Sequence, residues 1–500
     1  DNEFELIFNI NAGSKVYFGD LNLSLPLNYD RENFFDLSKT LDQLSGTPYS
    51  INSINKIVED IDNIALSEQF ETIDVRVNEK FNLNKLDLEF IVSESEKSFI
   101  KKINILGNNI TRENVIRNQF EIDEGDFYND ILYNKTLNNL KSLNFFKNVK
   151  GDIKNENSTN DKIIDITVEE KPTGELGASL GFGTDDTNLG FFVKENNYLG
   201  SGVSLLGNIM VGTDSIKGLL SVTNPNYNDT DKLVYTTIQS TEINKLTDFG
   251  YKTNQTGFSF GTKFELLDDF VFGIGTSNFY EKIETDSTAS ALRKTQEGDY
   301  WDTFINLDFN YDKRNQRYKP SEGFRSIFNI NMPVISETNT LTNSYNLNHY
   351  SELYQNNITS VSFFLKTANS LTDDNIKLTE RLFLPSNKLR GFSNGGVGPK
   401  DGNDYIGGNY AGSVNIVSTL PQLTEQLENF DINVFMDVGN VWGVDYSSTI
   451  NQSNKVRSSI GIGAEWLTPV GPLNFSFAET LTKADSDTTE SFRFNLGTTF

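Results

Sequence analysis

The chain has 500 residues, no cysteine, one histidine and a formal net charge of −26. The lack of cysteine excludes a disulfide framework and a thiolate metal site, and the single histidine, His349, excludes a histidine metal cluster. Strong acidity without a basic stripe argues against a nucleic-acid partner, because phosphates need cations to neutralise them. No run of about 18 apolar residues occurs, which excludes a transmembrane helix.

Residues 1–171 combine helical and strand periodicities and predict two copies of one α+β unit. In the first copy we expect a strand at 16–25, helices at 34–44 and 54–64, and strands at 73–77 and 86–92. The same β-α-α-β-β order recurs from Ile100. Asp30-Arg-Glu-Asn33 matches Thr111-Arg-Glu-Asn114, so the repeat has a period of about 80 residues.

We expect the two units to occupy residues 13–95 and 96–171. The sequence begins without a signal peptide, inside an alternating segment at residues 4–10. The sequence is therefore expected to be a mature fragment that lacks its N-terminal portion.

From residue 172 onward helical periodicity disappears, and period-2 alternation dominates to the last residue. In the segment 301–312, aromatic and aliphatic residues share one side, while Asp302, Asp308 and Asp312 share the other and are expected to face water. About sixteen such segments occur between 172 and 500. They predict a closed, antiparallel, 16-stranded transmembrane β-barrel. A soluble β-sandwich is the alternative, but it does not explain the many aromatic faces opposite polar ones.

The first and last barrel strands must meet to close the barrel. We expect the first at 175–183, where glycines including Gly177 and Gly181 weaken packing and pairing. The last is expected at 490–500, with Phe494 and Phe500 on its apolar face and Asn495 on the opposite one.

The longest interruption between the barrel strands lies at about 369–409 and contains the tetrapeptide Leu389-Arg-Gly-Phe392. A loop of this length is usually functional. Wherever a guanidinium such as that of Arg390 is confined in a barrel lumen, it requires a planar acceptor, and a carboxylate that accepts two hydrogen bonds is the strongest one available.

Several motifs, taken together and in order, resemble the family of bacterial outer-membrane protein assembly factors represented by BamA. Besides Leu389–Phe392, they are Ile105-Leu-Gly-Asn-Asn-Ile-Thr111, Glu124-Gly-Asp-Phe-Tyr128, Asp437-Val-Gly-Asn-Val-Trp442 and Trp466-Leu-Thr-Pro-Val-Gly-Pro-Leu473. The resemblance spans nearly the whole chain. It implies that residues 13–95 and 96–171 are POTRA domains and that residues 1–12 are the final strand of a preceding one. It also implies that the long loop folds back into the barrel lumen.

The resemblance also assigns roles to individual residues. Arg390, with Leu389, Gly391 and Phe392, would form the lumenal loop motif, and Asp437 on the inner wall is its first candidate partner. A second family acid falls at Asn415, which lacks the charge. The lateral gate would involve Gly177, Ala178, Gly181, Phe494, Asn495 and Phe500, and we expect Ala178 and Asn495 to be close enough for a disulfide. The POTRA docking edges would be at Ile73, Val75, Val77, Phe146 and Val149.

The implied function is the folding and insertion of β-barrel proteins into the bacterial outer membrane, through a gate between the first and last strands. The expected partners are unfolded outer-membrane barrel clients, accessory outer-membrane lipoproteins and the lipid bilayer, with no nucleic acid. We expect no enzymatic activity, no cofactor and no metal. The barrel would lie in the outer membrane and the POTRA domains in the periplasm.

Two alternatives remain open at this point. A related POTRA-barrel translocase for secretion or autotransporter assembly would share the repeat and the loop motif, although an additional POTRA strand at 1–12 favours the assembly factors. A passive porin is a further alternative and would show steady, selective conductance. A hydrolase is not favoured, because the aspartate pairs of the chain lie in turns without catalytic partners.

Overall fold

The computed structural model describes residues 16–496 apart from 27–28, 48–49, 68–72, 83–84, 95–97, 157–160, 185–186, 318, 355–356, 373, 403, 422–429, 446–449, 451–453 and 469–470. The chain divides into two compact units, Asp1–Pro172 and Thr173–Phe500. Among the described residues, no helix is both long and apolar enough to cross a membrane. The expected strand at 4–10 and the terminal Phe500 lie outside the described residues.

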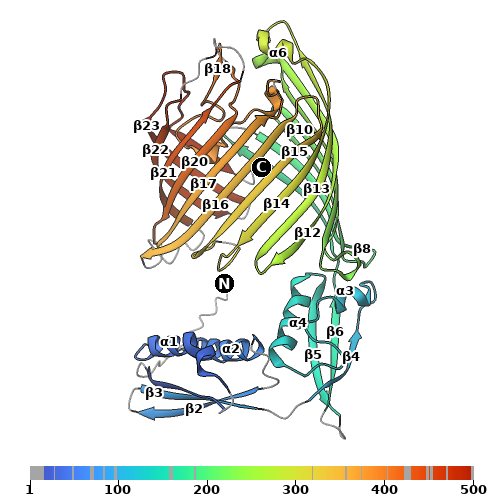
Figure 1. The fold of residues 1–500 in the computed structure, drawn as a ribbon, viewed down its shortest axis with the longest axis vertical. Helices are drawn as coiled ribbons and strands as arrows, with labels where there is room; N and C mark the ends of the chain where they lie inside the picture. The colour runs from blue at the N-terminus through green and yellow to red at the C-terminus, as the bar shows by residue number, and fades with distance from the viewer. Residues whose placement is uncertain are drawn as a thin grey trace, which may run out of the picture. The chain divides into compact units, whose positions relative to one another are not determined.

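The first α+β module of the N-terminal unit is a three-stranded sheet with two helices (Figure 1). Strand β3 (Lys85–Glu94) lies in the middle, parallel to β1 (Tyr17–Ser24) and antiparallel to β2 (Ile73–Asn82). A 3-10 turn, η1 (Arg31–Phe34), leads into α1 (Phe35–Leu44), and α2 (Ile51–Ser67) follows. Alternate residues of β3 and one face of each helix form a single buried core: Phe18, Phe34, Leu37, Leu41, Ile57, Ile61, Leu88 and Phe90.

The second α+β module repeats this arrangement with shorter helices. Strand β6 (Lys162–Glu170) lies between β4 (Ile100–Leu106) and β5 (Phe146–Asn155), and the helices are α3 (Glu113–Arg117) and α4 (Asp130–Ser142). The turn after β4 depends on Gly107, whose φ is +91° and whose added Cβ would lie 2.1 Å from the carbonyl oxygen of Val168. The carboxylate of Glu170 then accepts the backbone N–H groups of Asn109, Ile110 and Thr111 at 2.6–2.9 Å. The short helix α3 begins just after this turn, at Glu113.

The second unit is a closed antiparallel barrel of sixteen strands, which confirms the predicted fold class. Each strand pairs with its neighbours in chain order, and the last strand meets the first. The strands are β7 (Gly174–Gly183), β8 (Thr187–Tyr198), β9 (Val203–Gly212), β10 (Ser215–Asn224), β11 (Leu233–Lys245), β12 (Tyr251–Leu267), β13 (Phe270–Thr285), β14 (Gly298–Asp312), β15 (Gly323–Ile335), β16 (Thr340–Tyr354), β17 (Asn357–Ser370), β20 (Tyr410–Thr419), β21 (Phe430–Trp442), β22 (Arg457–Thr468), β23 (Gly471–Thr482) and β24 (Phe492–Leu496).

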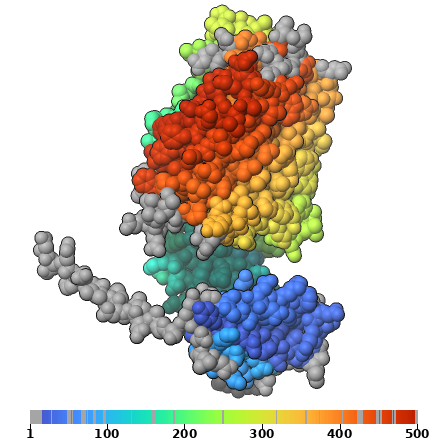
Figure 2. Space-filling view, turned by 90° about the vertical axis from the view of Figure 1, so that its left-hand side faces the viewer, coloured from blue at the N-terminus to red at the C-terminus, as the bar shows by residue number. Residues whose placement is uncertain are grey.

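The alternation along these strands places apolar side chains on the outer face of the barrel. Figure 2 shows one side of this face, where the colours of successive segments run in inclined bands. On β7, Leu176, Leu180 and Phe182 are 82%, 61% and 49% exposed. On β21, Met436 is exposed, whereas its neighbour Asp437 is completely buried. This pattern is the one expected when the outer face contacts lipid and the inner face is polar.

One prediction about the inner face is wrong. Asp302 on β14 was expected to face water, but it is only 3% exposed. A loop covers it and supplies a cation, as described below, so the polar face of a barrel strand here indicates a contact with protein as well as with water.

Candidate functional site

The candidate site is the long loop between β17 and β20. It contains two 3-10 turns, η3 (Leu378–Glu380) and η4 (Ser386–Lys388), and a short hairpin of β18 (Lys400–Asp401) and β19 (Asp404–Tyr405). Its stem is closed by reciprocal backbone hydrogen bonds between Leu382 and Gly408, at 2.8 and 2.9 Å. The loop has an apolar core of its own, shared with the inner wall of β17, β20 and β21: Phe364, Ala368, Ile376, Leu382, Leu384, Leu389, Phe392, Val397, Ala411 and Val441.

Arg390 is held on the inner wall by Asp437 of β21. Its Nε donates to Oδ2 and its Nη2 to Oδ1, each at 2.7 Å, and its backbone N–H also donates to Oδ2 at 3.0 Å. The guanidinium lies 3.4 Å from the ring centroid of Phe435. Asp437 is completely buried, so this pair has the geometry in which a carboxylate binds arginine most strongly.

Asn415 lies directly opposite Asp437 in the β20–β21 register and contacts Arg390 only indirectly. Its Nδ2 donates to Asp437 Oδ1 at 2.9 Å and to the carbonyl oxygen of Lys388 at 2.8 Å. The structure therefore places Asn415 as a support of Asp437 and of the loop, rather than as a second acceptor for the guanidinium. An amide can fill this position because its N–H group donates to the carboxylate, which a second acid could do only when protonated.

Gly391 and Phe392 pack the motif against the last strands of the barrel. Gly391 has a φ of +90°, and an added Cβ would lie 3.1 Å from that of Ser459 on β22 and 3.3 Å from that of Ala478 on β23. Phe392 is 1% exposed. The motif therefore combines the ion pair of Arg390, the close approach to β22 and β23 that Gly391 permits, and the buried ring of Phe392.

Beyond the motif, the loop pairs with the segment that leads into the closing strand β24. Phe392 and Thr489 form an antiparallel bridge, flanked by hydrogen bonds from Ser393 N to Thr488 O at 3.0 Å and from Glu490 N to Gly391 O at 3.1 Å. Arg493, the second residue of β24, donates to the carbonyl oxygen of Phe392 at 3.0 Å. We call residues 488–490 the lead-in of β24. The lead-in thus has its described backbone partners in the loop.

The seam between β24 and β7 has a short described register. Asn495 lies opposite Gly183 and Leu496 opposite Phe182, and Thr184 N donates to Phe494 O at 3.1 Å. The rings of Phe182 and Phe494 are 5.7 Å apart on the outer face. The expected proximity of Ala178 to Asn495 is wrong, because Ala178 is five residues away from Gly183 along an extended strand.

The other predicted gate residues lie within β7. Gly177 and Gly181 face the lumen, where an added Cβ would meet Phe192 at 2.3 Å and Asn188 at 2.6 Å on β8. These glycines therefore allow close packing of neighbouring side chains on the inner face. Their role in a gate remains a proposal, as does that of Phe500, which lies outside the described residues.

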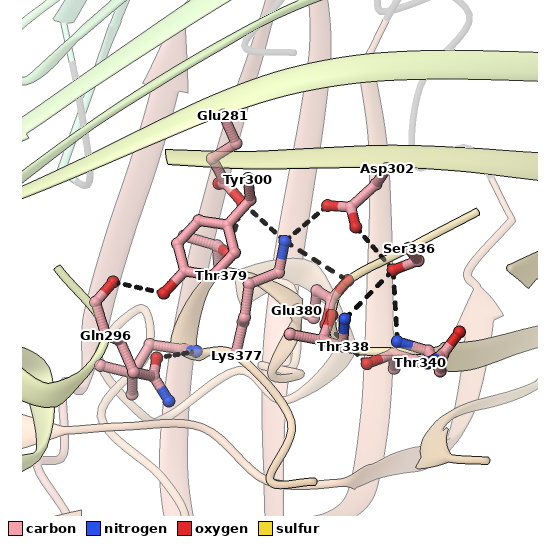
Figure 3. A network of polar contacts seen from close by, with 12 residues as sticks. Glu281, Gln296, Tyr300, Asp302, Ser336, Thr338, Thr340, Lys377, Thr379 and Glu380 are labelled. Carbon is pink, nitrogen blue, oxygen red and sulfur yellow. Dashed lines mark hydrogen bonds and ion pairs between the residues drawn. The ribbon is translucent and has the colours of Figure 1, made fainter. Parts of the chain in front are cut away.

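A charged cluster centred on Lys377, at the stem of the loop, was not predicted from the sequence (Figure 3). The Nζ atom lies 2.6 Å from Asp302 of β14, 3.1 Å from Glu281 of β13 and 3.8 Å from Glu380 of the loop itself. Lys377 is 2% exposed, and its Nζ lies 4.6 Å from the ring centroid of Tyr300. The only signal in the sequence was the row of acids on one side of β14, which had been assigned to water.

The loop acid Glu380 completes this cluster. It accepts hydrogen bonds from Thr340 Oγ1 at 2.6 Å and Thr338 Oγ1 at 3.2 Å. Burial raises the pKa of Glu380, although the Lys377 ammonium opposes the change. For Lys377 burial disfavours the charge, but the three surrounding carboxylates outweigh it and raise the pKa, so the cation persists at neutral pH.

Two further arginines, also missed, fix neighbouring loops. Arg457 of β22 is completely buried and donates to both carboxylate oxygens of Asp487, at 2.9 and 2.8 Å, which holds the loop between β23 and β24. Arg293, in the short helix α6 (Ala291–Thr295), forms an ion pair with Asp404 of the β18–β19 hairpin. In the described part of the chain, no group of three or more acidic, histidine or cysteine side chains could hold a metal ion.

The predicted docking edges lie in the two outer strands β2 and β5. The side chains of Ile73, Val75 and Val77 pack against the core of the first module, and those of Phe146 and Val149 lie in the core of the second. A partner at either edge would therefore meet the backbone groups of the strand rather than these side chains.

A sixteen-stranded barrel with a folded lumenal loop, preceded by repeated α+β modules, defines a class of outer-membrane proteins. Residues 175–500 match the family model of the Omp85 superfamily domain, and residues 98–171 match the POTRA model, described as a surface antigen variable number repeat. The chain belongs to the Omp85 superfamily.

Among curated proteins, the chain is similar to outer membrane protein assembly factor BamA of Neorickettsia risticii, with 23% identity over 99% of this chain and 68% of that protein. It is also 23% identical to BamA of Neisseria meningitidis serogroup B, over 93% of this chain and 65% of that protein. The chain thus spans about two thirds of the length of these relatives.

Among solved structures, BamA from Haemophilus ducreyi lacking POTRA domains 1–3 superposes with a TM-score of 0.71 and 21% identity, covering 97% of this chain and 100% of that one. CdiB from Escherichia coli gives a TM-score of 0.56 at 12% identity, over 98% of this chain and 92% of that one. These likenesses concern the fold.

Proposed function

We propose that this protein is an outer-membrane protein assembly factor that folds β-barrel clients and inserts them into the outer membrane. The observation that carries the proposal is the closure of the barrel, in which the last strand β24 meets the first strand β7 at a seam with Asn495 opposite Gly183 and Leu496 opposite Phe182. A strand in lipid must satisfy its backbone groups, so a seam that separates presents two edges on which a client strand can pair. Similarity to proteins named BamA supports the same assignment.

The lumenal loop argues for this function over a passive pore. Its own apolar core and its contacts with β13, β14, β21 and the lead-in of β24 place a folded element inside the barrel. A pore needs an open water path, whereas an insertase needs a barrel wall that can open sideways. We further propose that the modules at 13–95 and 96–171 are POTRA domains that lie in the periplasm, with the barrel at 172–500 in the outer membrane.

Clients and accessory outer-membrane lipoproteins would dock on the backbone edges of β2 and β5 by adding a strand to each sheet. A photocrosslinker at the exposed edge position Lys150 should capture a client segment. The same group at Lys39, on the exposed face of α1, is the control. Equal capture at both positions would count against edge docking.

The central experiment is reconstitution of the protein into liposomes together with an urea-unfolded outer-membrane barrel. We expect client folding to be accelerated by on the order of tenfold or more over liposomes without the protein, a change of about 1.4 kcal/mol in the activation free energy. A porin of similar mass serves as the control for bilayer disturbance. Steady conductance without accelerated folding would identify a channel, and transport of a single passenger without folding of other barrels would identify a secretion translocase.

A further inference from the structure

The stem of the loop is held on a different side of the barrel from the gate. Counted from β7, strands β13 and β14 are the seventh and eighth of sixteen, about halfway round from the seam between β24 and β7. Lys377 joins the loop to both of these strands through Glu281 and Asp302. Thr379 Oγ1 also donates to Glu281 at 3.1 Å, and Leu378 N donates to Gln296 at 2.7 Å (Figure 3).

The other end of the same loop contacts the seam side. Residues 391–393 pair with the lead-in of β24, and Gly396 accepts a hydrogen bond from Thr488 N at 3.0 Å. Arg493 ties β24 itself to the loop through the carbonyl oxygen of Phe392. The loop therefore spans the lumen from the strands opposite the seam to the strand that forms one side of it.

Between these two ends the loop is a packed body. Ile376, next to Lys377, and Phe392, at the start of the pairing with the lead-in, belong to one buried apolar cluster. The Leu382–Gly408 bridge closes the stem, and Arg381 donates to Ile376 O at 3.1 Å and Asn409 Oδ1 at 2.8 Å. Close-packed groups transmit displacement, because they cannot deform continuously.

We propose that Lys377 is a positioning residue that anchors the lumenal loop to the wall opposite the seam and thereby fixes the lead-in of the closing strand β24. The strength of this anchor depends on the positive charge of Lys377. One ammonium neutralises part of a buried group of three carboxylates, so its removal leaves these charges facing one another. The attachment of the loop stem is then weakened to the hydrogen bonds of Leu378 and Thr379. The consequence for a gate rests on the proposed function, but the positional coupling does not.

The test compares amide hydrogen exchange of residues 484–493 in the full chain, embedded in lipid nanodiscs without client. In Lys377→Met we expect exchange in this segment to rise by about tenfold, because the lead-in opens more often. Lys377→Arg keeps the charge and should restore slow exchange. Lys313→Met is the matched control, since Lys313 pairs with Asp269 at 2.6 Å in an exposed turn, and it should leave the segment unchanged.

The fold of each variant is checked by the heat-dependent gel mobility of the barrel. Should Lys377→Met fail to fold, Glu281→Gln removes one anchor contact with little change in shape and is expected to give a smaller increase in the same segment. Faster exchange confined to residues 371–382, with 484–493 unchanged, would overturn the proposal. Because no client is present, failure of this test is distinguishable from failure of the proposed insertase activity.

A disulfide between the loop and the lead-in tests whether the loop is what holds the lead-in in place. An added Cβ at Gly396 lies 3.1 Å from the Cβ of Thr488, slightly closer than in an ordinary disulfide. In Lys377→Met, the double change Gly396→Cys and Thr488→Cys should return the segment to slow exchange under oxidising conditions and release it with reductant. Exchange that stays fast in the oxidised protein would show that the lead-in is fixed by something other than the loop.

Discussion

The seam and the wall opposite it are built by different means within one barrel. At the opposite wall, β13 and β14 pair without interruption from Phe270–Tyr311 to Ile283–Gly298. At the seam, the described pairing of β24 with β7 is limited to Asn495–Gly183 and Leu496–Phe182. The wall is therefore held by a long ladder of its own backbone. Strand β24 pairs with β23 from Leu473–Leu496 to Phe477–Phe492, and the residues just before it take backbone partners from the lumenal loop.

The lumenal contacts differ in the same way. At the opposite wall, the loop is attached by charge, through Lys377 and its carboxylates, and the strands there would remain paired without it. At the seam side, the loop itself supplies backbone partners to residues 488–490. The difference indicates that the loop contributes little to the pairing of β13 with β14 but determines where β24 begins. This is expected where the edge of a strand must be held in place until a partner strand pairs with it.

The largest expected effect comes from locking the seam. Gly183→Cys with Asn495→Cys joins residues that lie directly opposite each other, since an added Cβ at Gly183 would be 2.2 Å from Asn495 Oδ1. Oxidation should reduce client folding in liposomes to the level of liposomes without protein, and reductant should restore it, because the edge strands can no longer separate. Disulfide formation is followed by gel mobility.

The control for this lock lies away from the seam, in the continuous pairing of β20 with β21. Ile416 and Met436 are opposite each other on β20 and β21, and both are exposed on the outer face. Cysteines at these two positions should leave client folding unchanged in either redox state. Full activity of the oxidised seam variant would show that clients enter by a route other than the seam.

A smaller effect is expected from Asp437→Asn, which removes the charge that holds Arg390. Breaking a buried ion pair on one side costs about 3–5 kcal/mol, because the remaining charge is left without its partner. The loop should detach from β21, and client folding should slow by about fivefold while the barrel stays folded, less than the complete loss expected of the locked seam. Protease cleavage within 386–399 measures the detachment, and unaltered cleavage would contradict the role of this pair.

Much of this arrangement is predictable from local sequence. Period-2 alternation is a property of each strand alone, so the number and order of barrel strands follow without knowledge of long-range contacts. The pair of Arg390 and Asp437 was predicted from the family resemblance, in which a short motif carries each partner. The role of Asn415 was not predicted: its side chain donates to Asp437 and does not bind the arginine.

The rest depends on closure and on distant partners. The register of β24 on β7 is set by the stagger of the closed barrel as a whole, so no local pattern could place Asn495 opposite Gly183 rather than near Ala178. Lys377 meets acids that are 75 and 96 residues away, and neither β13 nor β14 shows by its own periodicity that a loop will cover it. Polar residues on the inner face of a barrel strand therefore predict a polar neighbour. They do not predict whether that neighbour is water or another part of the protein.

The smallest effect on client folding is expected from Arg457→Gln, which tests whether the lead-in is held by the lumenal loop or by the contact of Asp487 with Arg457. Arg457→Gln removes the bidentate contact to Asp487 that holds the loop before β24, while β22 keeps its register with β21 and β23. Because pairing of residues 488–490 with the lumenal loop is retained, we expect client folding to fall only about two- to threefold, below the effect of Asp437→Asn. Hydrogen exchange should rise in 482–487 and remain slow at 488–490. Equal acceleration in both segments would mean that Asp487, rather than the lumenal loop, fixes the start of the closing strand.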